Sequence, residues 1–251
     1  MILNELKIFS QNVCKNSFII NLILEVQISY DVIFIQEPSW SFIHSILSSK
    51  NSKEEELVRV SNYPNWITFS RNSIISNNLP RVITYINIRL TSLCFSLCKD
   101  VFNYRNISCI FFFNYSLVYF LINIYSDSSQ IALKYLKDTE ININNVIIMT
   151  GDFDIRDCSW NHNFLHHSID KDTLIDIANY FQLELSEPIN KVPTRYSDNQ
   201  CESNSVINLM FFRLYSLEYN NHSIYLDLHL TSDHILLMVN ISITFKPKSI
   251  L

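Results

Sequence analysis

The sequence predicts an α/β (α+β) fold in which two β-sheets pack face to face and helices cover their outer sides. Short runs of β-branched and aromatic residues recur along the 251 residues, with a few amphipathic segments between them. Hydrophobic residues make up 48% of the chain and charged residues 17%, so the chain can bury a core. No internal repeat and no linker is visible. We therefore expect one domain over residues 1–246, followed by a tail at 247–251.

The N-terminal segment indicates a strand, a helix and a second strand. Leu6–Val13 is a β-like run, Ser17–Ile28 is apolar and long enough for a buried helix, and Asp31–Ile35 is a second apolar run. Polar residues close both strands, the second in Gln36-Glu37-Pro38. Loops at strand ends commonly hold catalytic residues on a rigid scaffold, so these positions are candidate site residues.

The segment from Ile107 to Tyr125 is apolar enough to suggest a membrane span. Asn114 interrupts it, however, and Asn114-Tyr115-Ser116 is typical of a turn. Two β-rich runs, Cys109–Phe113 and Leu117–Tyr125, flank that turn. A β-hairpin is therefore the prediction, with a transmembrane helix as the alternative.

The remaining elements follow from the same periodicities. Polar and apolar positions alternate with a helical period in Ser129–Thr139 and in Asp172–Leu183, which predicts two amphipathic helices. Further strands are expected at Trp66–Ser70, Arg81–Asn87, Asn145–Thr150, Ser205–Phe212 and Leu236–Thr244.

Glycine is almost missing from the chain. A domain of this size would hold roughly 17 glycines at about 7% usage, and this one has a single glycine, Gly151. Turns that need positive φ must then use other residues, and we expect Asn and Asp in those positions. Marginal stability is a further expectation.

Charge and cysteine content restrict the function classes. The net charge of −5 argues against a tight nonspecific binder of nucleic acid, because such proteins neutralise phosphates with basic side chains. The six cysteines form no C-x-x-C pair, so we expect free thiols in a reducing compartment. No signal peptide is visible at the N-terminus. Together these features predict an intracellular protein, nuclear or cytoplasmic, that is neither secreted nor bound to a membrane.

The candidate site residues lie at strand ends, far apart in the sequence. Asn12 follows the first strand, Glu37 closes the second, and Tyr125 closes the hairpin. Asp152 follows a buried strand in Thr150-Gly151-Asp152-Phe153-Asp154, and Asp233-His234 precedes the last strand. Hard oxygen ligands with one histidine are a plausible Mg²⁺ site, because Mg²⁺ takes few protein carboxylates and keeps waters for substrate phosphate.

This ordered set resembles the endonuclease/exonuclease/phosphatase superfamily, which includes abasic-site endonucleases. The likeness is closer to the endonuclease domain of non-LTR retrotransposons, especially fungal-type elements. Segments that carry it besides the site motifs are Gln36-Glu37-Pro38-Ser39-Trp40, Pro80-Arg81-Val82-Ile83-Thr84-Tyr85 and Ser205-Val206-Ile207. The resemblance runs from about Leu6 to about Ser242 and implies a four-layer sandwich with two mixed β-sheets.

The resemblance also implies a role for each residue. Glu37 would hold Mg²⁺, or Mn²⁺ in its place, with Asn12 beside it and Asp233 completing the site. Asp152 would orient or deprotonate the attacking water, and His234 would stabilise charge on the phosphoryl group. Three further residues would contact the nucleic acid: Tyr125 the scissile phosphate, and Arg156 and Trp160 other parts of the DNA.

Two positions depart from the family pattern. The family has Asn where this chain has Asp154, which places a second anion near the phosphate. The family has Asp where this chain has Asn208, and that Asp normally pairs with the histidine, here His234. A carboxylate partner favours the imidazolium form, and an amide does this poorly.

Three other groups of polar residues have a structural interpretation. Cys158, His162, His166 and His167 suggest zinc, but their spacing matches no common site, so a polar surface loop is the expectation. Lys50, Lys53 and the Glu54–Glu56 run are expected in a solvated loop. Arg81, Arg89 and Lys99 suggest a modest basic face, and scattered surface positions are the alternative that we favour.

Four functions remain open from the sequence. The first is a Mg²⁺-dependent DNA endonuclease, fused to or derived from a protein with a reverse transcriptase, that nicks target DNA for retrotransposition. The second is a catalytically impaired remnant of such an element that keeps the fold. A binding module without chemistry and a phosphatase of small phosphoesters are the others.

Overall fold

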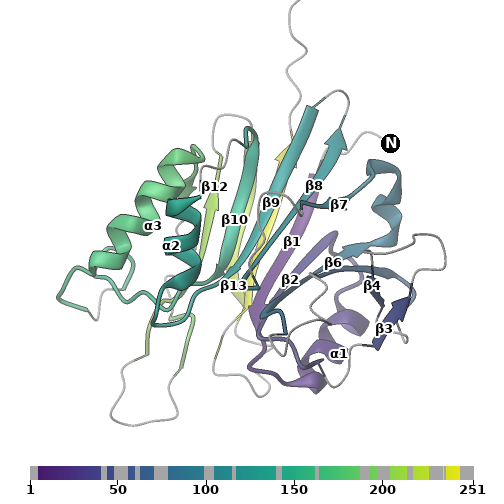
Figure 1. Cartoon of the computed structure of the whole chain (residues 1–251), viewed down its shortest axis with the longest axis horizontal. Coiled ribbons are helices and arrows are strands. Elements are labelled where there is room, and N and C mark those ends of the chain that lie inside the picture. Colours follow the sequence, from purple (N-terminus) through teal and green to yellow (C-terminus); the bar gives the residue numbers. More distant parts are fainter. Residues whose placement is uncertain are drawn as a thin grey trace, which may run out of the picture.

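The chain was analysed in a computed structural model (Figure 1). It describes residues 5–40, 44–47, 56–59, 63–70, 79–98, 105–114, 117–139, 143–161, 164–186, 193–196, 204–213, 217–225, 234 and 236–243. The expected boundary between residues 246 and 247 lies outside this part of the chain. Among the described residues, no helix is long and apolar enough to cross a bilayer.

Two six-stranded sheets make up most of the molecule. In the first, the strand order is β13 (Leu217–Tyr225), β14 (Leu236–Ile243), β1 (Glu5–Asn12), β2 (Val32–Gln36), β6 (Val82–Asn87), β5 (Trp66–Phe69). In the second it is β11 (Glu184–Leu185), β12 (Asn208–Phe212), β10 (Val146–Asp152), β9 (Leu117–Tyr125), β8 (Ile107–Asn114), β7 (Ser96–Leu97). A separate pair joins β3 (His44–Leu47) to β4 (Glu56–Arg59).

Each large sheet mixes both strand directions. β1 runs parallel to β2, and β9 runs parallel to β10, whereas β14 and β6 flank the first pair and β12 and β8 flank the second in antiparallel directions. The prediction of two mixed sheets is therefore confirmed. Parallel neighbours end at the same edge of a sheet, so the last residues of β1, β2, β9 and β10 are brought to that edge.

The layers are held by three apolar clusters. One cluster fills the space between the sheets and includes Phe34, Phe112 and Met210. On the outer side of the first sheet, helix α1 (Ser17–Val26) packs on β1 and β2. On the outer side of the second sheet, α2 (Ile131–Asp138) and α3 (Ile169–Tyr180) lie together (Figure 1). This is the four-layer sandwich that the resemblance implied.

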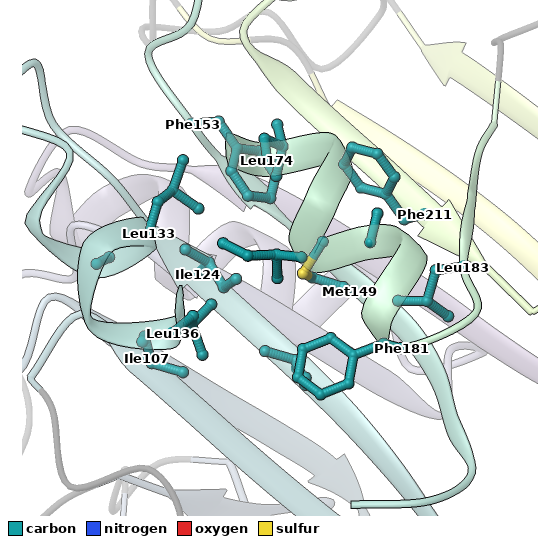
Figure 2. Packing of buried hydrophobic residues seen from close by; sticks show 14 of the residues in the cluster. Ile107, Ile124, Leu133, Leu136, Met149, Phe153, Leu174, Phe181, Leu183 and Phe211 are labelled. Atoms are coloured by element: carbon teal, nitrogen blue, oxygen red, sulfur yellow. The ribbon is translucent and has the colours of Figure 1, made fainter. Parts of the chain in front are cut away.

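A cluster of buried apolar side chains packs α2 and α3 against the second sheet (Figure 2). Leu133 and Leu136 come from α2, Leu174 comes from α3, and Met149 comes from β10 below them. The Phe153 and Phe211 rings meet edge to face with centroids 5.9 Å apart, a geometry that aromatic pairs favour. Phe153 directly follows Asp152, so the outer core anchors the chain next to a candidate site residue.

Most predicted elements are present with small shifts at their ends. The hairpin forms as β8 and β9, which confirms it over the membrane span. The predicted helix Asp172–Leu183 is α3, but it begins at Ile169, because the Ser168 side chain accepts a hydrogen bond from Asp170 N and caps the first turn. Sequence analysis missed β3, β4, β7, β11, β13 and the 3-10 helix η2 (Ile88–Leu93). The expected loop over Glu54–Glu56 is wrong at Glu56, which begins β4.

A buried amide on β9 ties the two sheets together. Asn123 is fully buried, and its Nδ2 donates to the carbonyl oxygens of Ile35 and Ile83 in the opposite sheet, at 3.3 and 3.1 Å. Its Oδ1 accepts from Gln36 Nε2 at 2.7 Å. Buried polar groups cost free energy unless they are paired, so this bridge fixes one register between the sheets. The site residues lie just beyond these positions on β2 and β9.

Gly151 stands where a side chain has no room. In the parallel pairing of β10 with β9 it lies opposite Ile124, and its φ is +156°. A Cβ built there would lie 1.8 Å from the carbonyl oxygen of Ile124 and 2.7 Å from its carbonyl carbon. Both obstacles are backbone atoms and cannot move without separating the two strands. The position thus requires the chain's single glycine.

Eight other described residues have positive φ without being glycine, and the expectation that they would be Asn and Asp is mostly wrong. Asn145 and Asp154 fit it. The other six are Cys14, Lys15, Glu37, Cys94, Gln130 and Gln182. Left-handed backbone costs such residues roughly 1–2 kcal/mol each. This strain is a physical reason to expect low stability.

We predict that Gly151→Ala prevents stable folding. The added methyl group collides with the β9 backbone, and relief requires parting β9 from β10, so the loss should exceed about 4 kcal/mol. Urea unfolding followed by circular dichroism measures it. Gln182→Gly is the matched contrast: Gln182 has a φ of 59° just after α3, and glycine there should stabilise by about 0.5–1 kcal/mol. A Gly151→Ala protein with wild-type stability would contradict the account.

Candidate active site

The candidate site lies at one edge of both large sheets, where strand ends from each sheet meet. Asn12 ends β1, Glu37 follows β2, Tyr125 ends β9 and Asp152 ends β10. The antiparallel neighbours begin at this same edge. Asn208 starts β12 opposite Asp152, and His234 lies just before β14. Residues separated by more than 200 positions in the sequence are thereby brought together.

An amide links the two central carboxylates. Asn12 Nδ2 donates to Asp152 Oδ2 at 2.7 Å and lies 3.2 Å from Glu37 Oε2. Its Oδ1 accepts from the backbone N–H of Cys14 at 2.9 Å, which fixes the orientation of the amide. Asn12 is 1% exposed. The two carboxylates therefore converge on one point inside the edge of the sandwich.

Arg81 supplies the positive charge beside Glu37. Its guanidinium donates to Glu37 Oε1 and to Asp127 Oδ2, both at 2.8 Å. These three side chains are between 16% and 33% exposed, so the charges are partly shielded from water. Charge-assisted hydrogen bonds of this length are stronger than neutral ones. The proposed basic face is not formed by Arg81 and Arg89, because they lie at opposite ends of β6 and Arg89 pairs with Asp31; Lys99 lies outside the described residues.

Tyr125 packs against the same arginine. The guanidinium carbon of Arg81 lies 3.8 Å from the centroid of the Tyr125 ring, which is a cation–π contact. The pKa of the Tyr125 phenol is raised well above its ordinary value, first because the ring is buried and then because Glu37 is near. Its hydroxyl thus keeps its proton and remains a hydrogen-bond donor.

His234 is held through its Nδ1 atom. That atom lies 3.3 Å from Asn208 Oδ1 and 3.7 Å from Asp152 Oδ2. An amide oxygen accepts hydrogen bonds and cannot donate them, so Nδ1 carries the proton of this pair. The second distance is too long for a good hydrogen bond, but it places the Asp152 carboxylate next to the imidazole. Asp152 therefore supplies negative charge that Asn208 lacks.

Two side chains missed by sequence analysis hold Asn208 and His234 in place. Thr194 is fully buried, and its Oγ1 accepts from the backbone N–H groups of Ile207 and Asn208, each at 2.9 Å. Gln11 Nε2 donates to the carbonyl oxygen of His234 at 3.3 Å. Neither residue could be recognised from the sequence, because each forms hydrogen bonds with backbone groups that are distant in the sequence and become neighbours only on folding.

The two aspartates after β10 share one environment. Asp152 Oδ1 accepts from the backbone N–H of Asp154 at 3.2 Å, and Asp154 has a φ of 46°. The pKa of each carboxyl is raised, above all by burial. For Asp152, His234 and the Asn12 amide oppose this rise; for Asp154, the opposing charges are those of Arg156, Arg195 and His234. Asp154 therefore lies near cationic side chains as well as near other carboxylates.

The predicted DNA-contacting residues follow Asp152 along the chain. Arg156 is half-buried and lies close enough to Asp154 to act on its charge. Trp160 is also half-buried, and its indole N–H donates to the carbonyl oxygen of Ile155 at 3.1 Å. Their contact with DNA stays a prediction. Asp233, predicted to complete the metal site, lies outside the described residues.

The donor chemistry of the site suits a divalent cation of the magnesium class. The convergent ligand atoms are the carboxylate oxygens of Glu37 and Asp152, and Mg²⁺ prefers such hard oxygen donors. Both carboxylates lie beside the same Asn12 amide nitrogen, which gathers their oxygens in one part of the site. Arg81 now balances Glu37 and must share that carboxylate with any bound ion.

Comparisons with known proteins identify the architecture. The sequence matches no protein-family profile and no curated protein. Solved structures do match. The endonuclease domain of TRAS1, a telomere-specific non-LTR retrotransposon, has a TM-score of 0.63 and 14% identity over 95% of this chain and 99% of its own.

Two further structures agree. The AP endonuclease LMAP from Leishmania major has a TM-score of 0.64 and 12% identity, covering 96% of this chain and 89% of its own. An endonuclease/exonuclease/phosphatase family protein from Leptotrichia buccalis has a TM-score of 0.56 and 14% identity over 96% of this chain and 100% of its own. The chain has the endonuclease/exonuclease/phosphatase fold. The resemblance seen in the sequence is therefore confirmed at the level of the fold.

We predict that Arg81→Met lowers stability and that Mg²⁺ restores part of the loss. The change leaves the partly buried Glu37 and Asp127 carboxylates without their cation, which should cost roughly 1–3 kcal/mol. A bound divalent ion supplies replacement charge. Thermal unfolding in EDTA and in Mg²⁺ measures both effects. Arg89→Met is the control, because it also frees a carboxylate at the other end of β6; if Mg²⁺ rescued both variants equally, the site assignment would be wrong.

Proposed function

We propose that this protein is a metal-dependent phosphodiesterase that nicks target DNA for retrotransposition. The observation that carries the proposal is the connected group at the sheet edge. Asn12 joins Glu37 to Asp152, and Asp152 lies 3.7 Å from the ring of His234. A fold scaffold alone does not require a buried and a partly buried carboxylate, an amide and an imidazole to converge, because polar groups are costly to bury.

Each residue of the site has a separate role in the proposed phosphodiester hydrolysis. Glu37, with Asp152 and Asn12 near it and Asp233 as a predicted further ligand, would hold Mg²⁺ or Mn²⁺. When bound, the ion supplies positive charge that polarises the phosphodiester. Asp152 accepts the proton of the attacking water. His234, whose Nδ1 lies 3.3 Å from Asn208 Oδ1, would stabilise the charge on the phosphoryl oxygens. The Tyr125 hydroxyl donates to the scissile phosphate.

DNA is the proposed substrate class. Solved structures of the same fold include the endonuclease of a telomere-specific non-LTR retrotransposon and the D. rerio TDP2 protein in complex with a single-strand DNA product. In this chain Arg81, Arg156 and Arg195 all lie near the acidic cluster. These local cations reduce the repulsion that the net charge of −5 would impose on a phosphate backbone. A link to reverse transcription is part of the proposal and rests on the sequence resemblance.

The two departures from the family pattern keep the number of carboxylates at the site unchanged. Asn208 lacks the charge that a family Asp would have, and Asp154 adds one on the other side of Asp152. We infer that Asp152 and Asp154 together provide the negative charge for His234, whose attraction acts on both carboxyls. The arrangement should support hydrolysis with reduced efficiency.

The test is nicking of supercoiled plasmid in Mg²⁺ and in Mn²⁺, with EDTA as the blank. We expect metal-dependent nicking by the unmodified chain. Glu37→Gln and Asp152→Asn should each lower the rate by about 10²–10⁴-fold. Asp138→Asn is the matched control, since it makes the same kind of change at an exposed position near the end of α2.

The double variant Asn208→Asp/Asp154→Asn distinguishes an impaired site from an intact one. We expect it to nick roughly tenfold or more faster than the unmodified chain, because a carboxylate beside His234 favours the imidazolium. Nicking by the double variant alone would support the catalytically impaired remnant. If folded protein of both forms leaves plasmid uncut but hydrolyses a small phosphoester, the DNA assignment is wrong.

A further inference from the structure

A second cluster of ligating side chains lies outside the active site. The loop that leaves β10 returns to the start of α3, and Asp157 ties its two ends together. Its Oδ1 accepts from the backbone N–H of Ser159 at 2.8 Å, and its Oδ2 accepts from that of Ser168 at 2.7 Å. The Cys158 N–H donates to the carbonyl oxygen of His166 at 3.3 Å. The loop thus has a fixed base.

Three side chains meet above that base. Cys158 Sγ lies 3.4 Å from His167 Nδ1 and 3.5 Å from its Nε2, and His167 Nδ1 lies 3.4 Å from Asp157 Oδ2. One ligand atom from each residue falls within 4.8 Å of the others. Ligands at about 2.3 Å for sulfur and 2.0–2.1 Å for nitrogen around a tetrahedral ion are roughly 3.5 Å apart. The sulfur–nitrogen separation matches that spacing.

The donor types select the ion. A thiolate with an imidazole and one carboxylate suits zinc and similar borderline-soft ions, whereas Mg²⁺ and Ca²⁺ take oxygen ligands. The Asp157 side chain is fully buried, whereas His167 is 69% exposed. A bound ion would therefore contact a fixed carboxylate on its inner side and solvent on its outer side. Asp157 Oδ2, the oxygen beside His167, accepts one backbone hydrogen bond from Ser168 and has a second lone pair for a metal.

A cation already lies beside this cluster. The Lys171 ammonium is 3.7 Å from Asp157 Oδ1 and 3.4 Å from His167 Nδ1. The contact shows that positive charge is favoured at this point. Lys171 is on the first turn of α3, and its ammonium must turn outward on its flexible side chain when a divalent ion binds.

We propose that Asp157, Cys158 and His167 form a binding site for a thiophilic divalent ion of the zinc class. The ion closes the loop between β10 and α3 and completes its fourth position with water. The proposal replaces the expected polar surface loop around Cys158 with a metal site. Spacing in the sequence did not indicate Asp157, which folding brings next to His167. The site is separate from Glu37 and does not depend on the proposed nuclease function.

The test is titration of the reduced, metal-stripped protein with Co²⁺ followed by absorption spectroscopy. A thiolate–Co²⁺ charge-transfer band should appear in the near ultraviolet and should be displaced by Zn²⁺. Cys158→Ser and His167→Gln should abolish it. Cys94→Ser and His166→Gln are the matched controls, since each alters an exposed residue outside the cluster, and both should retain the band.

Three further measurements test the position of the ion. Zn²⁺ at a hundredfold excess over Kd should raise the Tm by roughly 5–10 °C, and the rise should vanish in Cys158→Ser. Lys171→Met should tighten binding by about fivefold to tenfold, because it removes a like charge. Glu37→Gln should leave the band intact. A missing band, a band that survives Cys158→Ser, or unchanged affinity in Lys171→Met would each overturn the proposal.

Discussion

Gly151 sets the constraint on which the site depends, because at this point β10 approaches β9 too closely for any side chain. The Ile124 carbonyl oxygen occupies the space of a Cβ, and the φ of +156° is one that other residues rarely adopt. The next residue is Asp152, whose carboxylate receives hydrogen bonds from Asn12 and from the Asp154 backbone. The strand geometry at one glycine therefore determines where the central carboxylate lies.

The rest of the site is a balance of buried charge. Asp152 and Glu37 are brought together by strand ends from different sheets, and the Asn123 bridge between those sheets holds their relative position. Arg81 offsets Glu37, and the His234 ring lies 3.7 Å from the Asp152 carboxylate. Since charges in a partly dry environment act strongly on one another, removing one member changes all the others. A divalent ion bound at Glu37 would take over part of the positive charge that Arg81 now supplies there.

The sequence predicted what periodicity and motif order can predict. Alternating runs of polar and apolar residues located the main strands. The candidate residues at the strand ends, Asn12, Glu37, Tyr125 and Asp152, lie at one edge of the sheets in the structure. The role of Arg81 was missed, because its partners Glu37 and Asp127 become neighbours through strand pairing and not through spacing. Strand β13 was missed because Asn220 and Asn221 interrupt its apolar pattern, at the place where its pairing with β14 shifts register. Left-handed residues such as Gln182 gave no signal, since nothing local marks them.

The proposed chemistry requires a divalent cation at Glu37, with Asn12 and Asp152 near it, and locating that ion is the sharpest test. A crystal of the protein soaked in Mn²⁺ and measured at the manganese absorption edge would give its position by anomalous scattering. We expect an anomalous peak within coordination distance of the Glu37 carboxylate, with Arg81 moved from the contact that it now makes at 2.8 Å. A well-ordered site with no peak there, at a Mn²⁺ concentration that supports nicking, would contradict the proposed chemistry.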